Sequence, residues 1–117
     1  PDNATALNAL GYTLADRGER LDDAYDYIKR AYELSPGDFY ILDSMGWVLY
    51  RLGRLDEAID FLQKAFDLRN DPEVAAHLGE VHWIMGNKQA AKAVWETALQ
   101  DTPADDRLLK VIERFSP

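Results

Sequence analysis

The chain has 117 residues, a formal net charge of −8 at pH 7, 47% hydrophobic residues and no cysteine. This length suits one domain with a modest core, and no apolar run approaches the roughly 18 residues of a membrane-spanning helix. The acidic balance argues against binding to a nucleic-acid backbone, which needs clustered lysine and arginine. The lack of cysteine excludes disulfide and thiolate chemistry but leaves the redox compartment open.

Apolar residues at helical spacing predict six helices arranged as pairs. The first should run from residue 4 to 17, with Asn3 as its N-cap and Gly18 ending it in the left-handed conformation. The remaining five are expected over residues 21–35, 39–52, 55–69, 72–85 and 88–101. Asp38 and Asp71 come just before the third and fifth of these helices and are predicted to cap them.

Small residues recur at fixed offsets along the six helices. Gly11, Gly46 and Gly79 mark the first helix of each pair and are separated by 35 and 33 residues. The second helices carry alanines seven residues apart, namely Ala24 and Ala31, Ala58 and Ala65, and Ala91 and Ala98. A period near 34 with two helices per unit indicates three repeats, at residues 3–37, 38–70 and 71–103.

This pattern resembles the tetratricopeptide repeat family. The family places a large apolar residue before the glycine, and the chain has Leu10-Gly11, Met45-Gly46 and Leu78-Gly79. Pro36 and Pro103 stand at the closing position of the family pattern, whereas the middle repeat has Asn70 there. The resemblance implies an all-α fold, a right-handed superhelical solenoid of three helix-turn-helix repeats.

Residues 104–117 follow the third repeat and are predicted to form a C-terminal capping helix over residues 105–115. Apolar residues alternate there with charged ones at helical spacing. A solenoid exposes an apolar face at its last repeat unless another element covers it, which is the role expected for this helix. The N-terminal side has no equivalent, so we interpret the chain as the C-terminal part of a longer array.

By the resemblance, the first helix of each repeat lines a concave wall that binds a protein or peptide segment. The candidate binding residues are Asn8, Tyr12, Asp16, Tyr40, Asp43, Trp47, Tyr50, Arg51, Glu80 and Trp83, and Glu73 lies on the same wall. Exposed aromatic residues beside acids are typical of interface anchors, and favour a ligand with apolar and basic groups. The alternative is that Tyr50 and Trp83 pack against the helix of a neighbouring repeat.

Other sites are less well supported by the residues. Some family members bind acidic tails through lysine, asparagine and arginine on this wall, but Arg51 is its only predicted cation here, so we reject that ligand class. His82 takes a position held by leucine in the other repeats and is interpreted as a partly buried core residue, like Trp95. No catalytic motif, metal site or cofactor site is predicted, and the chain is not expected to be an enzyme.

The leading hypothesis is a non-catalytic scaffold that binds a protein partner and neither nucleic acid nor membrane. The alternative is a structural end-cap of a longer superhelix, with self-association through its open N-terminal face; a regulatory domain of an enzyme is a third. The chain also resembles the C-terminal repeats of long scaffold proteins and lipoproteins of Gram-negative bacteria. That resemblance implies an adaptor on the periplasmic side of the envelope, with a cytoplasmic location as the alternative.

Overall fold

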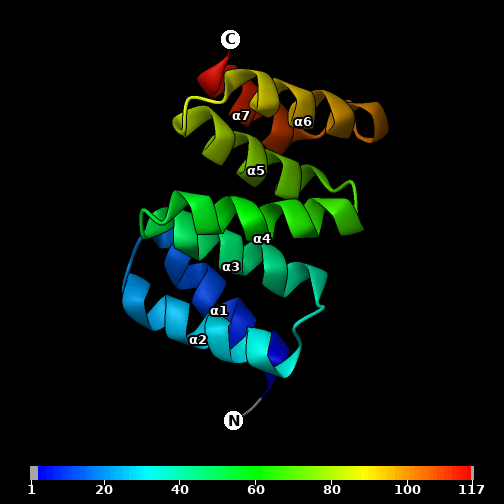
Figure 1. The fold of residues 1–117 in the computed structure, drawn as a ribbon. Coiled ribbons are helices and arrows are strands. Elements are labelled where there is room, and N and C mark those ends of the chain that lie inside the picture. The colour runs from blue at the N-terminus through cyan, green and yellow to red at the C-terminus, as the bar shows by residue number, and fades with distance from the viewer. Residues whose placement is uncertain (1–2, 117) are drawn as a thin grey trace. The chain divides into compact units, whose positions relative to one another are not determined.

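We describe a computed structural model of the chain, in which residues 3–116 are placed. These residues form seven α-helices and no strand (Figure 1): α1 (Ala4–Arg17), α2 (Leu21–Leu34), α3 (Phe39–Arg51), α4 (Leu55–Leu68), α5 (Pro72–Ile84), α6 (Lys88–Asp101) and α7 (Asp106–Phe115). All seven helices begin and end within one residue of the predicted bounds. Over residues 3–116, no helix combines the length and the apolar character needed to cross a membrane.

Short polar side chains fix where several helices begin. Asn3 accepts a hydrogen bond from the Ala6 amide at 2.9 Å. Asp38 and Asp71 do the same for the amides two residues further on, at 2.8 and 2.9 Å. These side chains satisfy backbone N–H groups that have no partner within the first helical turn. The three predicted N-caps are therefore confirmed, and Asp105 acts in the same way at the start of α7.

The two helices of each repeat cross at a glycine of the first helix. A large side chain of the second helix lies directly on that glycine, so an added Cβ atom would overlap it. The pairs are Gly11 with Ile28, Gly46 with Leu62 and Gly79 with Trp95. Only glycine allows this close approach of side chain to backbone, which explains why the glycines recur at the repeat period.

The chain divides into two compact units, Pro1–Ala65 and Phe66–Pro117, and the division falls within α4. In the first unit α1 packs on α2, and both contact α3. In the second unit α5 packs on α6 and on α7.

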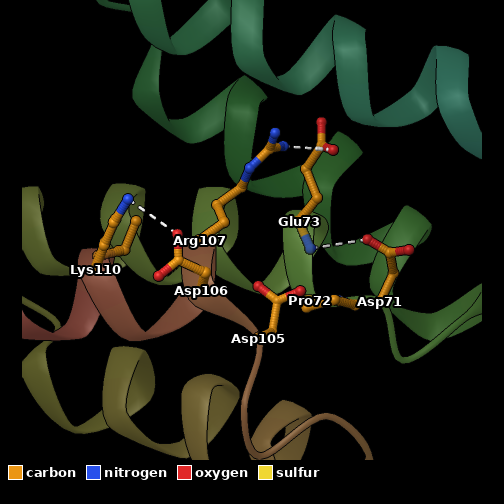
Figure 2. A pocket seen from close by; sticks show the side chains of 8 residues that line it. Asp71, Pro72, Glu73, Asp105, Asp106, Arg107 and Lys110 are labelled. Atoms are coloured by element: carbon orange, nitrogen blue, oxygen red, sulfur yellow. Dashed lines mark hydrogen bonds and ion pairs between the residues drawn. The ribbon is translucent and has the colours of Figure 1, made fainter.

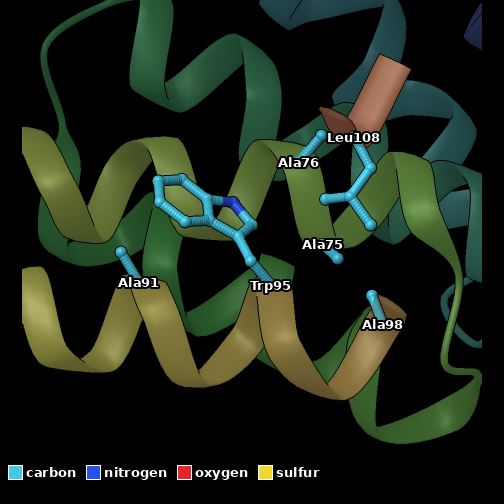
Figure 3. Close-up of a cluster of buried hydrophobic side chains, with 6 residues drawn as sticks. All are labelled: Ala75, Ala76, Ala91, Trp95, Ala98 and Leu108. Atoms are coloured by element: carbon cyan, nitrogen blue, oxygen red, sulfur yellow. The ribbon is translucent and has the colours of Figure 1, made fainter. Parts of the chain in front are cut away.

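The core of the second unit is built around Trp95 (Figure 3). Its indole lies among small residues of α5 and α6, and Leu108 of α7 completes the cluster, which consists of Ala75, Ala76, Ala91, Trp95, Ala98 and Leu108. Trp95 is 2% exposed and Leu108 fully buried, so the prediction that Trp95 is a core residue is confirmed. Alanines on both sides leave the room that the large indole fills.

Candidate functional site

The predicted binding residues occupy one face of each first helix, and we call these ten residues the wall face. Within α1 and α3 they recur at steps of three and four residues, so they share a side of the helix. Eight of them belong to the first unit, on α1 and α3, and Glu80 and Trp83 belong to α5 of the second unit.

On α1 the wall face is polar and partly accessible. Asp16 is exposed, whereas Asn8 and Tyr12 are half-buried. The side-chain oxygen of Asn8 is buried and accepts no hydrogen bond from any residue between 3 and 116. A buried amide oxygen without a donor costs free energy.

On α3 the aromatic residues differ strongly in exposure. Tyr40 is 61% exposed, whereas Trp47 and Asp43 are each 6% exposed. The ring of Trp47 lies 5.1 Å from that of Tyr50, which is half-buried. The expectation that Trp47 is an exposed anchor is therefore wrong, while its assignment to the binding face stays a prediction.

The burial of Trp47 has a reason that the sequence already contained. Every residue of α3 from Ile41 to Leu49 is buried, so this helix has little solvent-facing surface. A helix that is apolar on nearly all sides is an interior helix, and apolar residues fill most of the sequence from Phe39 to Leu49. The repeat pattern alone predicts a wall position for α3, and it carries no information on how many sides of the helix are covered.

Arg51, predicted to be the cation of the wall, has a structural role. Its Nε donates a hydrogen bond to the Ala15 carbonyl at 3.1 Å, in the last turn of α1. A cation at a helix C-terminus satisfies free carbonyl groups and favours the negative end of the helix dipole. Arg51 remains exposed, but its guanidinium links α3 to α1.

In the second unit, two acids of α5 are paired with two arginines of α7. Glu73 forms an ion pair with Arg107 at 2.5 Å, and Glu80 lies 3.5 Å from Arg114. Both the acids and the arginines are seven residues apart, so two turns of one helix match two turns of the other. This pairing was not predicted, because the apolar spacing of residues 105–115 indicates only a covering helix.

Trp83 packs within the second unit. Its ring stacks on Trp95 at 5.9 Å between centroids and lies 6.5 Å from Phe115 of α7. The Lys88 ammonium is 5.1 Å from the centre of the same ring. These contacts correspond to the packing alternative for Trp83, although the side chain keeps some exposure.

His82 is half-buried, as expected for a partly buried core residue. Burial lowers its pKa below the ordinary value because the imidazolium form loses hydration. Its Nδ1 atom is buried and forms no hydrogen bond with any residue between 3 and 116. A neutral imidazole with a low pKa suits a packing role.

A cavity of about 670 Å³ lies at the N-terminal ends of α5 and α7 (Figure 2). Its lining consists of Asp71, Pro72, Glu73, Asp105, Asp106, Arg107, Lys110 and Val111. Asp71 and Asp105 cap their own helices, Lys110 pairs with Asp106 at 2.9 Å, and Arg107 pairs with Glu73. The charged groups of the lining are thus engaged in ion pairs or in capping of helix N-termini.

The described residues form helix pairs that cross at glycines, which defines an all-α helical-repeat protein. A family model for the tetratricopeptide repeat matches residues 2–71, and the chain belongs to this family. The family is in general a non-catalytic protein-interaction module. The predictions of family and all-α fold class are confirmed.

Relatives and solved structures agree with this assignment. The TPR repeat-containing protein PA4667 of Pseudomonas aeruginosa is 52% identical over 80 residues, which are 68% of this chain and 14% of that protein. The structure of PcrH in complex with the chaperone binding region of PopB covers 95% of this chain and 90% of its own, at 21% identity and a TM-score of 0.77. The first TPR of Spaghetti (RPAP3) bound to the HSP90 peptide SRMEEVD covers 97% and 90%, at 18% identity and a TM-score of 0.81. Members of this fold therefore bind peptide or protein partners.

Proposed function

We propose that the chain is a non-catalytic scaffold whose wall face binds a protein or peptide segment. The observation that carries this proposal is Tyr40, which is 61% exposed at the start of a helix that is otherwise almost entirely buried. A rigid aromatic side chain left in water offers contact area at a low cost in conformational entropy. Two solved structures of the same fold, with a partner region or a peptide bound, support the proposal.

The partner chemistry follows from the charges of the wall face. Asp16 is an exposed acid on α1, and the whole chain carries a net charge of −8. In the second unit the acids Glu73 and Glu80 of α5 already pair with arginines of the same chain. A partner segment with an apolar anchor and nearby lysine or arginine is therefore favoured, because opposite charges align the two surfaces and speed their encounter.

For the whole protein we propose an adaptor role in bacteria, with this chain as the C-terminal part of a longer tetratricopeptide array. The support is the 52% identical relative from Pseudomonas aeruginosa, of which the chain spans 14%. Partner contacts made by these three repeats would then add to contacts made by other repeats of the same protein. A partner held at one site is at a high effective concentration for the next linked site.

The test compares capture of partners by the chain and by a Tyr40→Ala/Asp16→Ala variant, followed by titration of the partner identified. These two side chains are exposed, so their removal should leave the melting temperature nearly unchanged. Leu68→Ala is the matched control, because Leu68 is also 61% exposed but lies outside the wall face. We expect binding to be lost only in the double variant. Equal binding by all three proteins would disprove the wall-face assignment.

A second candidate function is self-association at α1, as in an end-cap of a longer array. Leu10 is 47% exposed, whereas Met45 and Leu78, at the same repeat position, are 3% and 0% exposed. An apolar residue that the repeat normally buries favours contact with another apolar surface. Light scattering over a concentration series should show a dimer that Leu10→Lys abolishes. A monomer at every concentration would exclude this function.

A further inference from the structure

A groove between α6 and α7 lies apart from the wall face. Its volume is about 190 Å³, and its lining consists of Lys92, Trp95, Glu96, Leu99, Ile112 and Ser116. Leu99 and Ile112 are half-buried, so the groove presents apolar surface between charged rims. All six residues belong to the second unit.

The repeat register identifies what this groove corresponds to. Asp105 caps α7 as Asp38 caps α3 and Asp71 caps α5, with separations of 33 and 34 residues. Helix α7 is therefore equivalent to the first helix of another repeat. In the same register, Lys92 and Leu99 of α6 correspond to Tyr25 and Tyr32 of α2.

In the first unit these equivalent positions are covered by a helix. The guanidinium of Arg54, at the start of α4, lies 5.3 Å from the ring centre of Tyr25. Phe61 of α4 packs edge-on against Tyr32 at 5.4 Å. The groove of the second unit thus corresponds to the position where, two repeats earlier in the chain, the amphipathic helix α4 packs on α2.

Glu113 changes which side chain a helix packed in this groove must place at the crossing with α7. It stands 34 residues after Gly79, in the place where each earlier first helix has its crossing glycine. At Gly46 the facing side chain of α4 is Leu62, which lies where a Cβ atom would be. An apolar residue set against the exposed carboxylate of Glu113 would desolvate it, whereas lysine or arginine would pair with it.

We propose that the groove between α6 and α7 binds an amphipathic helix of a partner protein with a cation facing Glu113. The apolar face of that helix packs on Leu99 and Ile112, as Phe61 packs on Tyr32 in the first unit. The groove itself is lined by one acid, Glu96, and one cation, Lys92, and Glu113 follows the lining residue Ile112 in α7. The second helices of the three repeats carry Ile28, Leu62 and Trp95 at the crossing, so a helix of that regular pattern would set an apolar side chain against Glu113.

The test uses α4 itself as the probe. A peptide of residues 54–69 with Leu62→Lys is titrated into the isotope-labelled chain, and amide shifts are followed by NMR. We expect shifts at Leu99, Ile112 and Ser116, and an affinity about fivefold higher than that of the unmodified peptide, the size typical of one ion pair.

Two variants of the chain make the result specific. Glu113→Gly should reverse the preference in favour of the unmodified peptide, and Glu113→Gln should remove the preference while keeping α7 helical. Equal affinity of both peptides for all three proteins, or an absence of shifts at the groove, would overturn the proposal. Shifts at the groove on concentrating the chain without peptide would instead identify a second copy as the occupant.

Discussion

At the scale of single residues, the crossing glycines and their partners decide how close two helices come. Trp95 takes the position that Ile28 and Leu62 hold in the other pairs, and its larger ring still lies on a glycine. The alanines Ala75 and Ala76 of α5 compensate for the added volume. At each crossing, the volume of the side chain that lies on the glycine is therefore matched by the size of the residues around it.

Gly79→Ala should destabilise the protein by about 1–3 kcal/mol, because the new methyl group meets the buried Trp95 ring. The gain in helix propensity of about 1 kcal/mol offsets only part of this. Gly37→Ala is the control, since no atom lies within 4 Å of its added Cβ. Urea unfolding followed by tryptophan fluorescence measures both. Similar midpoints for the two variants would contradict the close contact.

His82 should make stability depend on pH. Burial lowers the pKa of the folded state below the ordinary value, so the unfolded state binds the proton more readily. The stabilising difference is fully present above the unfolded pKa of about 6.5 and is lost as pH falls below it. His82→Leu, which restores the residue of the other repeats, should flatten the curve of unfolding free energy between pH 7.5 and pH 5. An unchanged slope would show that other groups cause it.

At the scale of elements, α7 combines an apolar and an ionic attachment to α5. Leu108 inserts into the cluster around Trp95, while Arg107 and Arg114 pair with acids two helical turns apart. Arg107 and Glu73 are 55% and 39% exposed, so their pair contributes little free energy, whereas Arg114 pairs with a Glu80 side chain that is only 8% exposed. Together the two pairs set the register of α7. The buried leucine supplies most of the attachment.

Leu108→Ala should cost about 2–4 kcal/mol and release α7, because it leaves a cavity in a fully packed cluster. Leu109→Ala is the matched control, as Leu109 is 42% exposed on the same helix. Hydrogen exchange should rise in α7 for the first variant only. Equal protection of α7 in both variants would show that the ion pairs hold this helix.

At the scale of the whole molecule, two compact units share one repeat pattern but present different surfaces. In the first unit, α3 buries nine consecutive residues and leaves Tyr40 and Asp16 as accessible parts of the wall face. In the second unit the acids of α5 are paired within the chain. Partner binding at the wall face is therefore expected to depend mainly on the first unit.

The sequence by itself determined the helices and their pairing. Capping side chains, a regular apolar spacing and glycines at a period near 34 are local features, and local geometry follows from them directly. The bounds of the helices and the core position of Trp95 could therefore be read from residue order alone.

Only the tertiary structure decided which wall residues are accessible. The hydrogen bond from Arg51 to Ala15 and the ion pairs between α5 and α7 join residues far apart in the chain. The exposure of a wall residue depends on which other helices cover its side of the helix. A repeat pattern identifies equivalent positions in each repeat, but it does not determine which helix covers each of them. For the same reason the groove between α6 and α7 could be recognised as a helix-packing position only once α7 was seen in the register of a further repeat.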